Sequence, residues 1–165
     1  MRFLFVCVLL CTCLSSFAQS KTTEKLHKDN KEALALFFYN NTLRMLNQSG
    51  DPDFDALIKD IEKMKFLMID KTKFGATDYK KLVTGYKSEA FEEIMTSRFE
   101  GKNFDVFLKE ENGKTKGMIV TVNDSTNLFV LDIVGSIALD KITSFYKSLD
   151  EGTEIGQRIK SFGKD

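Results

Sequence analysis

The chain has 165 residues, of which 42% are hydrophobic, with three cysteines, one histidine and a formal net charge of zero. This length predicts a single domain with its own core. A neutral balance without a basic cluster excludes a chain built to bind nucleic acid. Because all three cysteines precede residue 14, the rest of the chain lacks most catalytic and metal-binding side-chain sets, and we expect no cofactor.

The first 18 residues have the pattern of a secretory signal peptide. Arg2 is followed by an apolar run over 3–14 and then by Ser-Ser-Phe-Ala at 15–18, which is the order of charge, hydrophobic segment and small-residue cleavage site. The apolar run is shorter than the about 20 residues that span a bilayer. We therefore expect cleavage after Ala18 or Gln19 and a mature chain in the periplasm or outside the cell, with no transmembrane span.

All three cysteines, Cys7, Cys11 and Cys13, lie within this leader. Removing 18 of 165 residues leaves 147, with 23 basic and 24 acidic side chains, because Arg2 is the one charged residue lost. Such a chain must fold without disulfides. The alternative is a lipoprotein attached to the outer membrane through Cys13; Thr12 is atypical before a lipidated cysteine and argues against that anchor.

The N-terminal half is predicted to be mainly helical. Residues 19–29 form a polar lead-in, and 29–48 is predicted as the first helix, because apolar side chains recur at helical spacing from Leu36 to Leu46. A turn and short helix follow at 51–61. Alternating and then continuous apolar residues over 63–70 predict the first strand.

The next segment predicts a helix that begins at Thr77, and residues 91–99 favour a strand over a continued helix. Residues 104–135 predict a three-stranded meander. Its strongest signal is the Asn112-Gly113 pair, which is typical of a type I′ hairpin turn. That loop would pair Glu111 with Lys114, Phe107 with Met118 and Val106 with Ile119.

The C-terminal part continues the meander. Residues 123–127 predict a second hairpin loop and 128–134 a buried strand. Asp140 is expected to begin a final amphipathic helix, and 150–165 a flexible tail. Residues 30–149 therefore form one α+β domain, an antiparallel sheet of about five strands with helices packed on one face.

The chain resembles a family of small exported Bacteroidetes proteins known as a domain of unknown function. The similarity rests on the leader ending in Phe-Ala-Gln, the segment KMKFLMID, the hairpin KEENGKTKGMIVTV and the apolar strand that ends at Gly135. It covers about residues 32–149. These features describe a fold and not a chemistry, so the resemblance implies export and an α+β fold and supplies no catalytic residues.

The segment 51–62 has carboxylates spaced as in a twelve-residue calcium loop. Asp51, Asp53, Asp55 and Glu62 occupy positions 1, 3, 5 and 12, and a hard cation needs such converging oxygens. Ala56, however, replaces the glycine of the sharp turn. The alternative is that Asp51 or Asp53 caps a short helix.

Two single residues remain as candidates. Asp132 interrupts an apolar strand; it could be a functional acid with a raised pKa, but we favour a solvent-facing carboxylate on the open side of the sheet. Ser125 lies in the predicted second hairpin loop, in a Asp-Ser-Thr sequence similar to O-glycosylation sites of exported Bacteroidetes proteins.

The sequence contains no phosphate loop, zinc-spaced histidine cluster, nucleophile elbow or Ser/His/Asp set. We therefore predict a non-enzymatic exported domain that binds a protein or small-ligand partner in the periplasm or at the envelope. The alternative is a calcium-binding envelope protein that uses the segment from Asp51 to Glu62.

Overall fold

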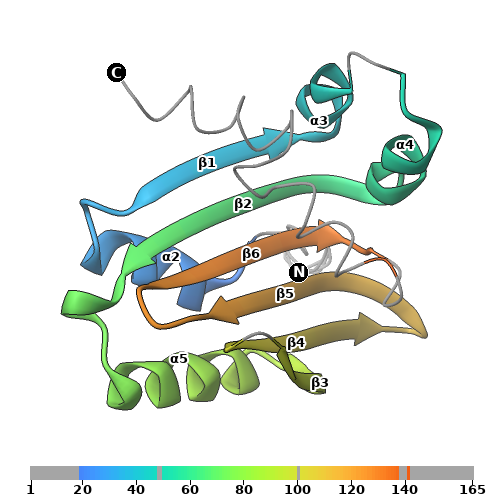
Figure 1. Ribbon diagram of the computed structural model, residues 1–165. Coiled ribbons are helices and arrows are strands. Elements are labelled where there is room, and N and C mark those ends of the chain that lie inside the picture. The colour runs from blue at the N-terminus through green and yellow to red at the C-terminus, as the bar shows by residue number, and fades with distance from the viewer. Residues whose placement is uncertain (1–18, 48–49, 100, 138–140, 142–165) are drawn as a thin grey trace, which may run out of the picture.

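The computed structural model describes residues 19–47, 50–99, 101–137 and 141. These residues form one antiparallel sheet with the strand order β1-β2-β6-β5-β4-β3 (Figure 1). The predicted leader at 1–18, most of the helix predicted from Asp140 and the tail predicted at 150–165 lie outside the described residues.

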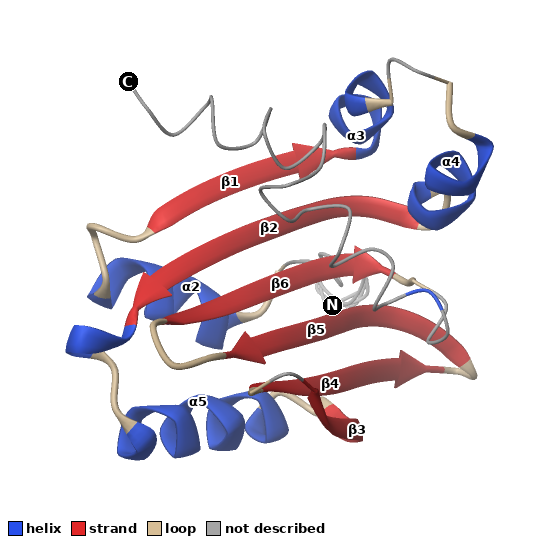
Figure 2. Ribbon diagram, in the orientation of Figure 1, coloured by secondary structure: helices blue, strands red, loops and turns tan. Residues whose placement is uncertain are grey.

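Helices and strands alternate in the first half of the chain, and strands follow one another in the second (Figure 2). The α+β class is confirmed, with six strands in place of about five. The strands are β1 (Leu34–Tyr39), β2 (Ile61–Asp70), β3 (Glu92–Phe99), β4 (Lys102–Glu111), β5 (Lys114–Asn123) and β6 (Asn127–Gly135). The helices are α2 (Lys21–Asp29), α3 (Asn40–Leu46), α4 (Pro52–Ile58), the 3₁₀ turn η1 (Lys71–Lys73) and α5 (Ala76–Ser88).

The sheet is assembled from a local and a long-range part. Strands β3 to β6 form a meander of consecutive antiparallel neighbours. Strand β2 pairs with β6 and with β1, and α5 carries the chain from β2 to the far edge of the sheet. Strand β6 therefore lies in the interior of the sheet, which explains why it is apolar on both faces.

Helices pack against both faces of the sheet, so the prediction that they cover one face was wrong. Helices α2 and α5 pack on the same face of the sheet, and Figure 1 shows α2 behind β2 and α5 along the edge near β4. Their buried side chains join those of the strands in one cluster: Leu26, Leu67, Ile69, Phe74, Leu82, Tyr86, Phe91, Phe107, Ile119, Leu128 and Val130. Helices α3 and α4 pack in the cluster of the opposite face, through Leu43, Leu46, Phe54 and Ile58.

The Asn112-Gly113 hairpin is confirmed. Both residues have positive φ, 54° and 69°, and Glu111 pairs with Lys114 as predicted. The pairs predicted further along the strands were wrong by one position, because the register shifts between Lys109 and Glu110. Phe107 consequently faces Ile119, and both are fully buried beneath the helices.

The first helix predicted over residues 29–48 was wrong. Its first half is strand β1, and only Asn40–Leu46 is helical. The six residues of β1, LALFFY, form a continuous apolar run, and periodicity does not distinguish a strand from a buried helix in such a run. Three aromatic residues in six and the neighbouring β2 decide in favour of the strand.

The lead-in predicted over residues 19–29 also has a different structure, because most of it is helix α2. Ser20 is its N-cap, and the Ser20 hydroxyl accepts from the amides of Thr22 and Thr23. Only Thr23 and Leu26 of this helix are buried. A helix with so little apolar surface depends on polar contacts to hold it against the sheet.

The remaining elements lie close to their predicted places. The strands predicted at 63–70, 91–99 and 128–134 are confirmed, and so is the loop after Asn123. Helix α5 is capped at Gly75 and not at Thr77. Gly135 ends β6 with φ of +106°, where a Cβ would lie 2.1 Å from the Asp60 carbonyl oxygen.

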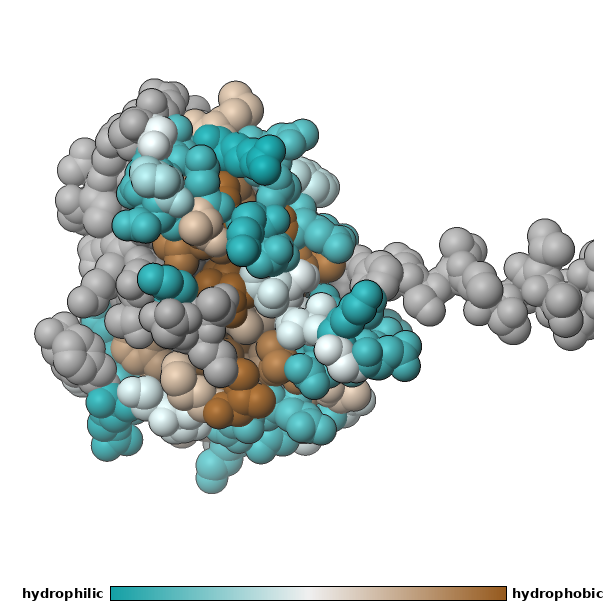
Figure 3. Space-filling model, turned by 90° about the vertical axis from the view of Figure 1, so that its right-hand side faces the viewer, coloured by the Kyte–Doolittle hydropathy of each residue, from teal (hydrophilic) through white to brown (hydrophobic). Residues whose placement is uncertain are grey.

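Hydrophobic residues gather through the middle of the side shown in Figure 3, between two groups of hydrophilic residues. The described helices are all too short or too polar to cross a bilayer.

Candidate functional site

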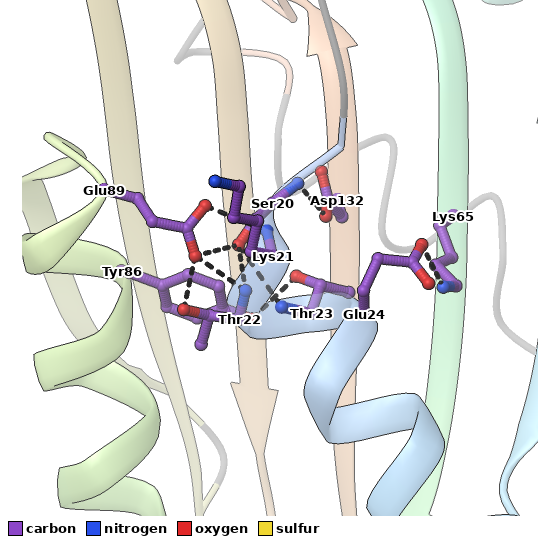
Figure 4. Close-up of polar contacts among 9 residues, drawn as sticks. All are labelled: Ser20, Lys21, Thr22, Thr23, Glu24, Lys65, Tyr86, Glu89 and Asp132. Carbon is purple, nitrogen blue, oxygen red and sulfur yellow. Dashed lines mark hydrogen bonds and ion pairs between the residues drawn. The ribbon is translucent and has the colours of Figure 1, made fainter.

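Charged and polar side chains meet between α2, α5 and the sheet, where the rest of the interface is apolar. We call this group the N-terminal cluster, because three of its members belong to the start of α2 and the residue before it. It consists of Ser20, Thr23, Glu24, Lys65, Tyr86, Glu89 and Asp132 (Figure 4).

Glu89 follows the last residue of α5 and reaches the first turn of α2 (Figure 4). Its carboxylate accepts from the amide nitrogens of Lys21 at 2.9 Å and Thr22 at 2.6 Å, and from the Ser20 hydroxyl at 3.1 Å. The first amides of a helix have no partner within the helix, and an anion is favourable at that end. Glu89 therefore caps α2 from another helix.

Asp132 comes from β6 and contacts the same turn from the sheet. Its Oδ2 accepts from the Ser20 amide at 3.0 Å, and its side chain is 1% exposed. The prediction of a solvent-facing carboxylate was wrong, because residue 132 lies on the face that α2 and α5 cover. Burial raises the pKa of Asp132 to about 7. Repulsion by Glu89 also raises this pKa, whereas the hydrogen bonds from Thr23 and Ser20 and the attraction of Lys65 lower it.

Lys65 is the direct cross-strand partner of Asp132 on β2, and its side chain is completely buried. Its ammonium group pairs with Glu24 of α2 at 2.6 Å, and it lies 4.9 Å from the centre of the Phe37 ring. The Glu24 carboxylate is 42% exposed. The ion pair therefore lies at the border between the covered face and solvent.

The hydroxyl groups of two tyrosines of α5 form hydrogen bonds on the face of the sheet that α2 and α5 cover. The Tyr86 hydroxyl lies 3.1 Å from that of Thr23, and burial raises the Tyr86 pKa above its ordinary value. The Tyr79 hydroxyl donates to Asp105 and lies 2.8 Å from the Thr121 hydroxyl. Burial and then the hydrogen bond to Asp105 raise the Tyr79 pKa. Both phenols are neutral at physiological pH and act as hydrogen-bonding groups.

The geometry gives the N-terminal cluster a positioning role. Tyr86 and Lys65 are completely buried and Asp132 nearly so, which leaves a substrate no path to the carboxyl group with the raised pKa. A groove of about 310 Å³ lies between α2 and α5 and is lined by side chains such as Lys25, Asp78 and Lys81, which are not members of the cluster. The interior groups thus attach a polar helix to the sheet.

The carboxylates of the predicted calcium loop do not converge. Asp51 is the N-cap of α4, and its Oδ1 accepts from the amides of Asp53 and Phe54. Asp55 accepts from the Asn47 side-chain amide, and Glu62 lies in β2. Among the described residues, no three acidic, histidine or cysteine side chains are placed to hold a metal ion. The helix-cap alternative describes this segment.

Ser125 is exposed in the short loop between β5 and β6, where the sequence predicted it. Its O-glycosylation stays a prediction. Cys13 and Ala18 lie outside the described residues, whereas Gln19 is half-buried and directly precedes the N-cap of α2. Cleavage after Ala18 or Gln19 stays a prediction.

The model of a protein family, Domain of unknown function (DUF4252), matches residues 25–145. The chain belongs to the DUF4252 family. The resemblance inferred from the sequence is confirmed in this respect. No curated protein and no solved structure matches the chain.

The DUF4252 match covers four of the seven residues of the N-terminal cluster. Lys65, Tyr86, Glu89 and Asp132 lie within the matched residues, whereas Ser20, Thr23 and Glu24 precede them. Sequence reasoning singled out Asp132 and missed its partners. One available signal was that Asp132 is the one charged residue of the apolar strand β6, since such a residue needs a partner that offsets the cost of its burial.

Proposed function

We propose that this DUF4252 domain is exported, loses its leader and binds a protein partner, without catalysis, at the outer edge of β1. The observation that carries the proposal is an exposed aromatic pair on that edge strand. The proposal includes the expected location in the periplasm or outside the cell, which rests on the leader sequence.

The aromatic pair is formed by Phe37 and Tyr39, which are 52% and 65% exposed. They are two residues apart on β1 and therefore point to the same side of the strand. Met45 of α3, the helix that directly follows β1, is 73% exposed. Aromatic residues and methionine are enriched where proteins bind one another.

The two edges of the sheet differ in their protection. The outer strand β3 carries Glu92, Glu93 and Arg98 and has a register shift after Glu93. Charged side chains and such irregularities keep an edge from pairing with another chain. Strand β1 has no charged residue and pairs with β2 in continuous register.

An extended segment of a partner protein fits such an edge. Added as a further strand, it would pair with the backbone of β1 and place apolar side chains against Phe37 and Tyr39. Among the described strands, β1 has β2 as its one neighbour. The site therefore favours a peptide-like partner with alternating apolar residues over a small polar ligand.

Burial of the unusual carboxyl group supports a role without catalysis. A general acid must reach the proton that it transfers, and Asp132 is 1% exposed. The proposal does not extend to calcium, because the Asp51 carboxylate already accepts two helix amides. Calorimetry that detected heat at millimolar calcium would contradict this restriction.

The test compares two edge-strand variants on envelope extracts. Tyr39→Lys places a charge on β1, and the control Ile94→Lys places one on β3, where Ile94 is 40% exposed. We expect the immobilised wild-type domain and the Ile94 variant to capture the same protein, and the Tyr39 variant to lose it at an unchanged melting temperature. Equal capture by both variants would refute the β1 site, and turnover in a broad hydrolase screen would refute the non-enzymatic role.

A further inference from the structure

The N-terminal cluster carries an imbalance of charge. Within the described part of the chain, the carboxylates of Glu24, Glu89 and Asp132 share one buried ammonium group, that of Lys65, which is paired with Glu24. Lys65 attracts Asp132 from the neighbouring strand, but its ammonium group is paired with Glu24, and the hydrogen bonds to Asp132 and Glu89 come from uncharged donors at the start of α2. A buried carboxylate that is not paired with a cation of its own is costly.

The contacts of Ser20 indicate where a further positive charge would pair with both carboxylates. The two carboxylates converge on Ser20, since Asp132 accepts from its amide at 3.0 Å and Glu89 from its hydroxyl at 3.1 Å. Adjacent backbone nitrogens are at most about 3.7 Å apart. The nitrogen of Gln19 therefore lies within about 7 Å of the Asp132 oxygen, near the range in which opposite charges shift each other's pKa.

We propose that the cluster is a binding site for the α-ammonium group of the mature chain, which pairs with Asp132 and Glu89 once the leader has been removed. The inference rests on the leader removal included in the proposed function. Cleavage after Ala18 is favoured because small residues, Ala18 and Ser16, occupy the last and the third-last positions before the cleaved bond. Gln19 is then the first residue.

The chemistry of processing creates the cation. Hydrolysis of the Ala18–Gln19 peptide bond consumes one water molecule, leaves a carboxylate on Ala18 and an α-amino group on Gln19. In an unfolded chain this amino group has a pKa of about 8, so it is protonated at neutral pH. Before cleavage the same nitrogen is an uncharged amide. The positive charge that could pair with Asp132 and Glu89 therefore forms only when the Ala18–Gln19 bond has been hydrolysed.

The pairing depends on pH in a specific way. The groups that face it are Glu24 from α2, Lys65 from β2, Tyr86 and Glu89 from α5, and Asp132 from β6. The pair needs an ionised Asp132 and a protonated amine. Its contribution is therefore largest near neutral pH, and it disappears when the amine loses its proton in base or the carboxyl gains one in acid.

The test is a double-mutant cycle on the chain that begins at Gln19, with a free or an acetylated α-amino group, in wild-type and Asp132→Asn backgrounds. At pH 7 we expect acetylation to lower the wild-type melting temperature by about 3 °C or more, and to have a clearly smaller effect in Asp132→Asn, where Glu89 alone remains to pair with the ammonium group. At pH 10 the wild-type difference disappears. Equal effects of acetylation in both backgrounds would overturn the inference.

A second measurement does not depend on the variant folding. In the wild-type chain, the NMR titration of the α-amine should give a pKa above its ordinary range of about 7.7 to 8.0. An ordinary pKa would overturn the pairing. So would conversion of Gln19 to neutral pyroglutamate in the protein isolated from cells, seen as loss of ammonia by intact mass. A chain with the leader still attached would instead refute the proposed processing while the in vitro pairing stood.

Discussion

Asp132 makes the stability of the domain depend on pH, and Asp132→Asn isolates the effect. The asparagine keeps an oxygen that can accept from the Ser20 amide and removes the charge. Both proteins begin at Gln19 and carry an acetylated α-amino group. Acetylation keeps the nitrogen of Gln19 uncharged, which is the state in which the pKa of Asp132 is raised to about 7. Folding then favours the protonated carboxyl group, since burial in the sheet raises the Asp132 pKa from 3.8 to about 7.

The size of the effect follows from this difference in pKa. The interval from 3.8 to about 7, at 1.36 kcal/mol for each pH unit, corresponds to about 4 kcal/mol. Because the folded pKa is raised, the contribution is fully present below pH 3.8 and is lost as the pH rises through about 7. Wild-type protein should lose this stability relative to Asp132→Asn, which has no charge to bury.

Urea unfolding at pH values from 4 to 8 measures the effect in both proteins. We expect the free energy of unfolding of the wild type, minus that of the variant, to fall by about 4 kcal/mol across this range. With a free α-amino group the fall should be smaller, because the ammonium stabilises the ionised carboxylate. A difference that stays constant with pH would refute the assignment of the raised pKa to Asp132.

Three further substitutions test other parts of the structure. Glu89→Ala removes the cap of α2 and should cost about 2 kcal/mol, with faster hydrogen exchange at the first amides of α2; unchanged exchange there would rule out the capping role. Gly135→Ala should lower the melting temperature far more than Gly101→Ala, because a Cβ at 135 meets a carbonyl oxygen at 2.1 Å and one at 101 meets nothing within 4 Å. Phe107→Ala should cost about 3 to 5 kcal/mol in urea unfolding, since Phe107 is completely buried; a loss below about 1 kcal/mol would contradict its place in the core.

The local parts of the fold could be predicted from the sequence. The Asn112-Gly113 turn, the strand at β2 and the loop after Asn123 depend on residues that are near one another in the chain. The register error beyond the hairpin came from one bulge after Lys109, which no residue pattern announced. The error at β1 arose because an apolar run of six residues fits either a strand or a buried helix.

The N-terminal cluster could not be predicted, because its contacts join distant parts of the chain. The Ser20 amide and the Asp132 carboxylate are 112 positions apart. Helix α2 has few buried residues of its own, so its sequence resembles a solvated lead-in. Its position becomes apparent only when β6 and the end of α5 supply Asp132 and Glu89.

The same separation constrains the order in which the chain can fold. The segment from Ser20 to Asp29 is the first of the described elements to be synthesised, whereas Asp132, which accepts from the Ser20 amide, lies on β6, the last of the described strands. Until β6 has been synthesised and has paired with β2, α2 has only its contacts with residues such as Glu89 and Tyr86. Complete attachment of α2 to the sheet therefore cannot precede the synthesis of almost the whole described chain.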